Sequence, residues 1–164
     1  RLGHSAVPEL TLSENILLSQ FPNNKFSKNG ILNRNSIEDY AIKVIENFNV
    51  VTPGSDARAS SLSGGNLQKF VIGREISSKP KLLIISHPTW GIDAGAEHSI
   101  RESLIDLSKN GTSIIVLSQD LDELIEISDS FTALVGGRIS DPKPMSSLNI
   151  RDIGQMMSGA MSYD

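Results

Sequence analysis

The stretch Leu62–Lys69 reads LSGGNLQK and opens an amphipathic segment of the chain. Ser63 offers a hydroxyl at the expected start of a helix, and Gly64 and Gly65 have no side chains to keep a ligand from their backbone N–H groups. The helix that follows adds the positive end of its dipole, so the turn suits a phosphate group. An ordinary N-cap after a glycine-containing turn is the plainer interpretation, and this stretch alone does not choose between the two.

Upstream of this stretch the apolar spacing is helical. Thr11 and Glu14 predict a capping box, in which each side chain binds a backbone N–H group at a helix start. The polar residues 20–35 predict a long loop. Ser36 then predicts the N-cap of a second helix, and a third helix is expected from the LSGGN turn to Pro80. The apolar stripe of the second helix consists of Ile37, Ala41, Val44, Ile45 and Phe48.

Downstream of Pro80 the pattern changes to short apolar runs. Leu82–Ile85 and Ile114–Leu117 are continuous apolar stretches, which are typical of strands buried on both faces of a parallel sheet. A helix is predicted between them, over about residues 94–110, with Gly111 ending it. This order predicts a strand–helix–strand unit with a right-handed crossover.

The last part of the chain predicts smaller elements. Asp120 and Glu123 form a second capping-box pattern. Gly136 and Gly137 predict a two-residue hairpin turn between strands at 131–135 and 138–140. A final short helix is predicted from the apolar residues Ile150, Ile153, Met156 and Met157.

Composition narrows the class of protein. The chain has 164 residues, with 38% hydrophobic and 21% charged side chains, as in ordinary globular proteins. Its net charge of −4 gives no overall field that attracts nucleic acid, so we expect no nucleic-acid partner. It has no cysteine, which excludes disulfides and thiolate metal sites, and its apolar runs are far shorter than the ~20 residues of a membrane span. Because it begins with Arg1 and not with Met, we expect a piece of a longer protein.

The order of these elements resembles that of the ATP-binding subunits of ABC transporters. The LSGGN turn is followed by a helix, an apolar run, Pro88-Thr89, Gly91-Ile92-Asp93 and a strand that leads into Ser118-Gln119-Asp120. Further segments are similar to importer subunits for nucleosides and simple sugars, which carry two fused nucleotide-binding domains. These segments are Arg1-Leu2-Gly3, Val7–Asn15, Phe48–Gly54 and Ile153–Gly159. The resemblance points to the C-terminal part of the second, degenerate domain.

The resemblance implies an α/β fold: a partial P-loop NTPase (ABC ATPase) core that lacks its Walker A half, plus an all-helical signature subdomain. It implies a segment after the Q-loop at 1–8, the helical subdomain at 9–80, the C-terminal part of the α/β core at 81–148, and a helical tail at 149–164. No stretch fits G-x-x-x-x-G-K-[ST], so the Walker A loop and its strand are expected outside these residues. A sheet without that central strand exposes unpaired backbone groups, and we expect the chain to rearrange or to self-associate.

In that family two domains pair head to tail, and each signature loop covers the ATP that the other domain holds. The resemblance therefore implies that Ser63 and the N–H groups of Gly64, Gly65 and Asn66 contact the γ-phosphate of ATP held elsewhere. Asp93 matches the D-loop aspartate of the same interface. Its plain structural role would be the N-cap of the helix that begins at the next residue.

Three positions depart from the family pattern. Active members end the strand before Pro-Thr with Asp-Glu, where this chain has Ser86 and His87, and their switch histidine falls at Gln119. A hydroxyl replaces carboxylate charge near Mg²⁺ poorly, and losing a positioned general base costs ~10²–10⁴ in rate. We therefore expect no catalytic residue and no metal ligands here, and ATP and Mg²⁺ bound mainly by residues outside this chain.

The function implied by the resemblance is the ATP-binding, energising component of a nucleoside or simple-sugar importer. Its expected partners are the other nucleotide-binding domain and transmembrane permease subunits, the latter contacted by residues 9–80. The expected location is peripheral, on the cytoplasmic face of the inner or cell membrane. The full-length protein is expected to hydrolyse ATP, and this chain alone to be inactive.

Two alternatives stay open. One is a soluble ABC-type ATPase that is not linked to transport; it should co-purify with ribosomes or DNA, which the acidic net charge disfavours. The other is a noncatalytic interaction module in which the turn at Ser63 is only a helix cap. Such a module predicts no nucleotide-dependent association with a domain that carries a Walker A loop.

Overall fold

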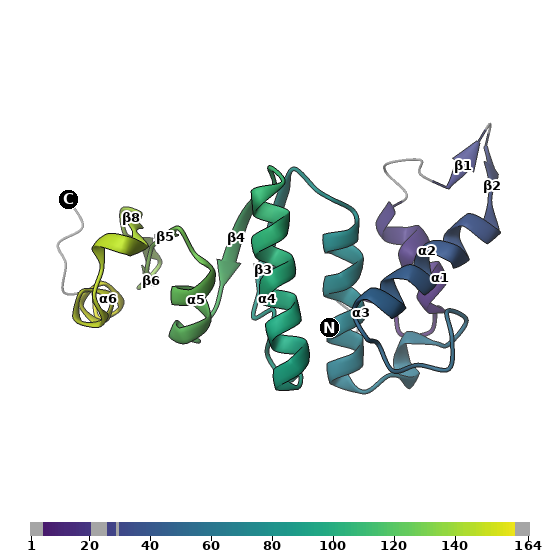
Figure 1. Cartoon of the computed structure of the whole chain (residues 1–164), viewed down its shortest axis with the longest axis horizontal. Helices are drawn as coiled ribbons and strands as arrows, with labels where there is room; N and C mark the ends of the chain where they lie inside the picture. The colour runs from purple at the N-terminus through teal and green to yellow at the C-terminus, as the bar shows by residue number, and fades with distance from the viewer. Residues whose placement is uncertain (1–4, 21–25, 29, 160–164) are drawn as a thin grey trace. The chain divides into compact units, whose positions relative to one another are not determined.

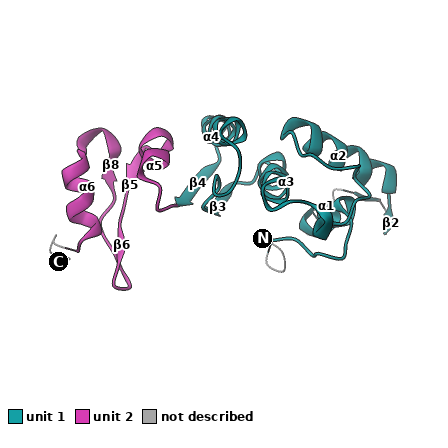
Figure 2. Cartoon of the chain, turned by 90° about the horizontal axis from the view of Figure 1, so that it is seen from below, with its two compact units in different colours: residues 1–117 teal, residues 118–164 magenta. Residues whose placement is uncertain are grey.

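The protein is described by a computed structural model that covers residues 5–20, 26–28 and 30–159. It divides into two compact units, residues 1–117 and 118–164, which Figure 2 colours separately. The division of the chain into segments 1–8, 9–80, 81–148 and 149–164 stays a prediction.

Three helices form the first layer of the first unit. They are α1 (Leu12–Gln20), α2 (Arg34–Asn47) and α3 (Gly64–Ser77), and a short 3-10 turn (Ala59–Ser61) precedes α3. Helix α2 contacts both α1 and α3, as Figure 1 shows. Full burial of each large side chain between them contributes about 1.5–3 kcal/mol. The core includes Leu12, Ile16, Ala41, Val44, Leu67 and Phe70.

The starts of these helices only partly follow the sequence prediction. The capping box of α1 is confirmed: the Thr11 N–H donates to Glu14 at 2.8 Å, and the Glu14 N–H donates to the Thr11 hydroxyl at 3.1 Å. The predicted cap of α2 is wrong, because Asn33 caps it and Ser36 supplies the N–H that Asn33 accepts. Both residues are good N-caps by type, so sequence position alone did not separate them.

The predicted loop at residues 20–35 contains secondary structure. Strands β1 (Ser27–Lys28) and β2 (Ile31–Leu32) pair antiparallel, so the loop prediction is wrong for these residues. The N–H of Asn33 donates to the carbonyl of Phe26 at 2.8 Å and continues this pairing up to the cap of α2. Residues 21–25 and 29 of the predicted loop lie outside the described residues.

A strand–helix–strand unit completes the first unit. Strands β3 (Leu82–Ser86) and β4 (Ser113–Leu117) pair in parallel, with Leu82 opposite Ser113 and Ser86 opposite Leu117. Helix α4 (Ala94–Lys109) connects them and lies along the pair in both Figure 1 and Figure 2. The predicted unit and the fold class are therefore confirmed. Gly111, at φ +94°, ends the helix as the pattern predicted.

The prediction that both strands are buried on both faces is wrong. Leu83 on β3 is buried, whereas its neighbours Leu82 and Ile84 are 53% and 62% exposed. Ile115 on β4 is 51% exposed on the same side. Alternate side chains of a strand point to opposite faces, and α4 covers only one of them. Among the described strands, β4 pairs only with β3.

The second unit is built from short elements. They are α5 (Leu121–Ile127), β5 (Ser130–Phe131), β6 (Leu134–Val135), β7 (Arg138–Ile139), β8 (Lys143–Pro144), a 3-10 turn (Met145–Ser147) and α6 (Ile150–Met157). Strand β5 pairs with β8 and β6 with β7, both antiparallel. Among the residues that the structure describes, none of the helices combines the length and the apolar character needed to cross a membrane.

Local signals predicted part of this unit. The predicted strand at 131–135 is divided: Phe131 belongs to β5, which pairs with β8, and β6 pairs with β7. Gly136 and Gly137 form the two-residue turn between β6 and β7, and both have positive φ, at +57° and +78°. Asp120 caps α5 by accepting from the Glu123 N–H at 3.1 Å, but its own N–H donates to the Ser118 hydroxyl, so only half of the predicted box forms. A reciprocal box that the sequence analysis missed starts α6, between Asn149 and Asp152.

Candidate functional site

The LSGGN turn is an exposed helix start. Ser63 is the N-cap of α3, and its hydroxyl oxygen accepts from the Asn66 N–H at 3.4 Å and from the Asn66 side-chain amide at 3.0 Å. Ser63 and Gly64 are exposed to solvent. Ser63 therefore caps the helix. The cap uses only the oxygen of its hydroxyl group, so the hydroxyl hydrogen is free to donate to a ligand. The Asn66 N–H, which was predicted to contact phosphate, donates to this cap instead. The Ser63 hydroxyl and the N–H groups of Gly64 and Gly65 are the predicted donors that can still face an anion.

Gly65 brings this turn against a second segment of the same unit. A Cβ atom at position 65 would lie 3.0 Å from the Gly91 carbonyl oxygen and 3.8 Å from Cα of Ile92. Only a glycine lets the two backbones approach so closely. The predicted signature turn and the predicted D-loop, which lie far apart in sequence, are therefore neighbours.

Asp93 ends that second segment and starts α4. Its carboxylate accepts from the Ala96 N–H at 2.9 Å, which confirms its predicted role as N-cap. This hydrogen bond is the main reason that the pKa of Asp93 lies below its ordinary value, and the nearby Lys69 ammonium lowers the pKa further. Asp93 is thus held as a carboxylate beside the glycine contact.

Two side chains on α3 support the turn, and the sequence analysis did not single out either for this. The Oδ1 atom of Asn66 accepts from the Val51 N–H at 2.9 Å. Lys69, whose side chain is 9% exposed, donates to the Asn49 carbonyl at 2.9 Å. No local sequence signal marks either contact, because both depend on how the loop after α2 packs on α3.

Ser86 and His87 lie at the C-terminal end of β3, as predicted. The N–H of His87 donates to the Leu117 carbonyl at 2.8 Å, and its own carbonyl accepts from the Gln68 side chain at 3.2 Å. His87 has φ +50°, in the left-handed region that favours glycine and asparagine. Gln119 lies in the second unit, and its side chain is exposed. Over the described ranges, no group of three or more His, Cys, Asp or Glu side chains could hold a metal ion.

A cleft of about 730 Å³ adjoins Ser86 and His87 between α3 and β3. Its polar wall includes Gln68 and the buried Arg74, whose guanidinium donates to the carbonyls of Ser5 and Asn15 at 2.9 and 3.4 Å. Arg74 therefore ties the segment before α1 to α3. The guanidinium is engaged by protein groups, which gives it a structural role.

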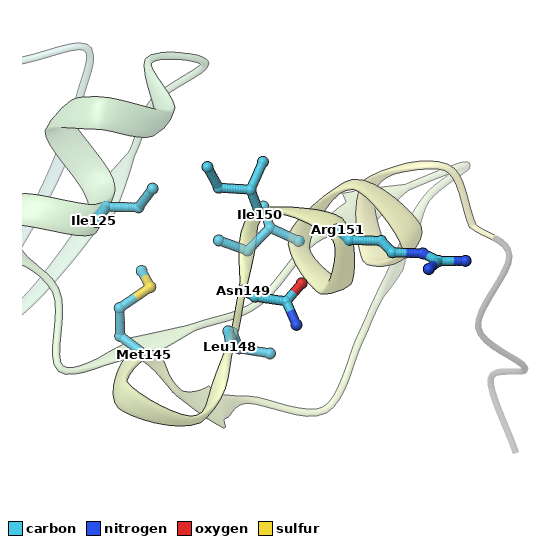
Figure 3. Close-up of a pocket in the computed structure, with 7 residues that line it drawn as sticks. Ile125, Met145, Leu148, Asn149, Ile150 and Arg151 are labelled. Carbon is cyan, nitrogen blue, oxygen red and sulfur yellow. The ribbon is translucent and has the colours of Figure 1, made fainter.

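The second unit holds a separate, apolar groove of about 530 Å³. Figure 3 shows Ile125 of α5 and Ile150 of α6 beside it, with Met145 below. Its lining contains no acidic side chain and no histidine. None of the site residues predicted from the sequence lines this groove.

Comparison with known proteins gives relatives along almost the whole chain. No family model matches it. The chain is 39% identical over 153 residues to the nucleoside import ATP-binding protein NupA of Lactococcus lactis, covering 93% of this chain and 30% of that protein. It is 34% identical to the guanosine import ATP-binding protein NupO of Bacillus subtilis, covering 98% of this chain and 31% of that protein.

The chain is homologous to the ATP-binding proteins of nucleoside and sugar import. The galactose/methyl galactoside import ATP-binding protein MglA of Escherichia coli is 37% identical over 131 residues, which make up 80% of this chain and 26% of that protein. The chain spans only about a third or less of the length of these curated relatives, at 30%, 31% and 26%.

Solved structures show the same fold for this chain. A dimeric ATP-binding cassette in a post-hydrolysis state with ADP and phosphate matches with a TM-score of 0.71 and 20% identity, over 85% of this chain and 59% of that one. An ATP-binding subunit of an ABC transporter matches with a TM-score of 0.71 and 23% identity, over 93% of this chain and 61% of that one. The predicted ABC ATPase fold is confirmed, and the roles of the individual site residues stay predictions.

Proposed function

We propose that this chain is part of the ATP-binding component of an ABC importer for nucleosides or simple sugars. The names of its relatives and the cassette fold of its structural neighbours support this proposal. Within that component, the chain supplies its signature turn and D-loop to ATP that a second nucleotide-binding domain holds. The observation that carries the proposal is the exposed Ser63–Gly64 turn, packed through Gly65 against the segment that ends at Asp93.

The residues of the turn fit a triphosphate. The Ser63 hydroxyl hydrogen and the N–H groups of Gly64 and Gly65 are donors at the N-terminus of a 14-residue helix, where the helix dipole favours negative charge. The nearest carboxylate of the adjoining segment, Asp93, has the Lys69 ammonium 3.7 Å away. That cation offsets the repulsion between Asp93 and a phosphate. Bound ATP would supply the phosphate charge that joins the two domains.

The chain's own site does not fit Mg²⁺ or hydrolysis. Ser86 and His87 at the end of β3 offer a hydroxyl and an imidazole, and Gln119 in the second unit offers an amide. A Mg²⁺ ion with bound phosphates prefers carboxylate oxygens. These residues therefore take no part in hydrolysis. Hydrolysis takes place at the partner domain's nucleotide, and this chain contributes donors to its γ-phosphate.

The proposed assembly contains the other nucleotide-binding domain and permease subunits, with residues 9–80 of this chain contacting the permease. The protein is peripheral, on the cytoplasmic face of the membrane. A soluble ABC-type ATPase not linked to transport is the alternative within the same fold. Affinity purification of the full-length protein separates the two, because the importer is expected with permease and the soluble ATPase with ribosomes or DNA.

ATP-dependent pairing tests the role of the signature turn. The chain and the partner nucleotide-binding domain are sedimented together, with and without ATP, as wild type, Ser63→Arg and Ser108→Arg. Ser108 is an exposed residue near the far end of α4, so its variant controls for the added charge and bulk. We expect association only with ATP, lost in Ser63→Arg and kept in Ser108→Arg. Association that ignores both ATP and Ser63 would instead support the noncatalytic interaction module.

A further inference from the structure

Lys69 is a buried cation for which the proposed chemistry has no direct use. Its side chain is 9% exposed, although lysine is almost never fully buried unless it is paired. The ammonium donates to the Asn49 carbonyl at 2.9 Å and lies 3.7 Å from the Asp93 carboxylate. One side chain thus connects α3 to the loop after α2 and to the start of α4.

The loop after α2 is held at two points by the same face of α3. Asn49 has φ +49°, so the chain turns sharply there, and its carbonyl is the one that Lys69 binds. Two residues later, the Val51 N–H donates to the Asn66 side chain at 2.9 Å. Asn66 and Lys69 are three residues apart on α3 and therefore lie on one face of the helix. Asn66 also donates to the Ser63 hydroxyl, which links this loop to the signature turn.

We infer that Lys69 is a positioning residue that holds the signature turn, the loop at residues 49–51 and Asp93 as one body. The inference rests on the proposed function, since it concerns how this chain presents Ser63 and Asp93 to the partner's ATP. Lys69 itself does not touch the nucleotide. The Ala96 N–H holds the Asp93 carboxylate, and the charge of Lys69 offsets the repulsion between that carboxylate and a phosphate.

The two contacts of Lys69 differ in strength. Asp93 is 68% exposed at its side chain, so solvent screens its ion pair with Lys69 and the pair alone is weak. The hydrogen bond to the Asn49 carbonyl is charge-assisted and is made by a buried side chain, so it is the stronger anchor. Loss of the ammonium is therefore expected to free the loop first and Asp93 as a consequence.

The test is the steady-state ATPase activity of the full-length protein as Lys69→Met, Lys69→Arg, Lys109→Met and Ser63→Arg. Methionine keeps the apolar stem and removes the charge, arginine keeps charge and donors, and Lys109 is an exposed lysine at the end of α4. We expect Lys69→Met to lower kcat about tenfold and to change KM for ATP less than about twofold, because misplaced groups that act only in the transition state lower kcat. Lys69→Arg is expected to restore at least half of kcat, and Lys109→Met to match wild type.

Each other outcome has a definite meaning. If Ser63→Arg lowers activity but Lys69→Met behaves like Lys109→Met, the inference about Lys69 is overturned and the proposed function stands. If Lys69→Met and Lys69→Arg lose activity equally, in proportion to the unfolded fraction seen by thermal melting, Lys69 has only a structural role and the inference is again overturned. If Ser63→Arg has no effect, the proposed function fails, and the inference fails with it.

Discussion

Gly65 on helix α3 lies against the backbone of Gly91, so closely that a Cβ at position 65 would stand 3.0 Å from the Gly91 carbonyl oxygen. This contact joins the signature turn to the segment that leads into Asp93. Because the obstacle is backbone, relief requires one of the two segments to move. The signature turn and Asp93 are proposed to face the partner domain's ATP together. Their relative position therefore depends on the absence of a side chain at Gly65.

Gly65→Ala is expected to lower ATPase activity of the full-length protein by about tenfold or more, because a misplacement of this kind separates donors from the γ-phosphate. The matched control is Gly154→Ala on α6, where a Cβ meets nothing within 4 Å. That substitution is expected to leave activity unchanged and to stabilise the helix by up to about 1 kcal/mol. Equal activity of the two variants would contradict the importance of the Gly65–Gly91 contact.

Gly73 and Phe48 make a second close contact, between α3 and the end of α2. A Cβ at position 73 would overlap Cδ2 of the Phe48 ring. Gly73→Ala is therefore expected to destabilise the protein by about 1–3 kcal/mol in urea denaturation. Phe48→Ala in the same chain removes the Cγ and Cδ2 atoms that the new methyl group meets and should recover part of this loss. Additive effects of the two substitutions would show that the ring is not the obstacle.

The sequence predicted the elements that begin at a capping residue or are joined by a glycine turn. Thr11 with Glu14, Ser63, Asp93 and the Gly136–Gly137 turn all formed as expected, because each signal acts within a few residues. The cap of α2 was misassigned, since Asn33 and Ser36 are both competent caps and the short pairing of β1 with β2 selects Asn33. The capping box at the start of α6 was not predicted, although the three-residue spacing of Asn149 and Asp152 is typical of one.

Long-range packing explains what sequence could not predict at the site. The neighbours Gly65 and Gly91, and the carbonyl that Lys69 binds, are set by how α3 packs on the following segment and on the loop after α2. No spacing rule links these positions. The apolar run of β3 predicted burial, but only tertiary structure decides that α4 covers one face and leaves Ile84 exposed.

The Glu14 cap predicts a pH dependence of stability. Hydrogen bonds from the Thr11 N–H and hydroxyl lower the pKa of Glu14 below its ordinary value of 4.5. A depressed folded-state pKa contributes stability above the unfolded pKa, and that contribution is lost as the pH falls through the folded pKa. Glu14→Gln should therefore lower Tm at pH 7 and have no effect near pH 2. A Tm difference that is constant with pH would contradict this.

The open face of β3 and β4 predicts self-association of the isolated chain. Leu82, Ile84 and Ile115 are more than half exposed, and β4 has only β3 as a partner among the described strands. Sedimentation of the 164-residue chain is expected to show dimers or larger species. Ile115→Lys should shift it towards monomer, whereas Ile42→Lys on α2, a partly exposed control, should not. A stable wild-type monomer would refute this prediction.

The central claim is that this chain acts on the partner's ATP while its own site is inactive. The most direct test compares the ATPase rates of full-length Ser63→Arg and His87→Asn, because asparagine tolerates the φ of +50° at position 87 but cannot act as a base. The account predicts that Ser63→Arg loses about tenfold or more and that His87→Asn stays within about twofold of wild type. Loss of activity in His87→Asn, or full activity in Ser63→Arg, would contradict it.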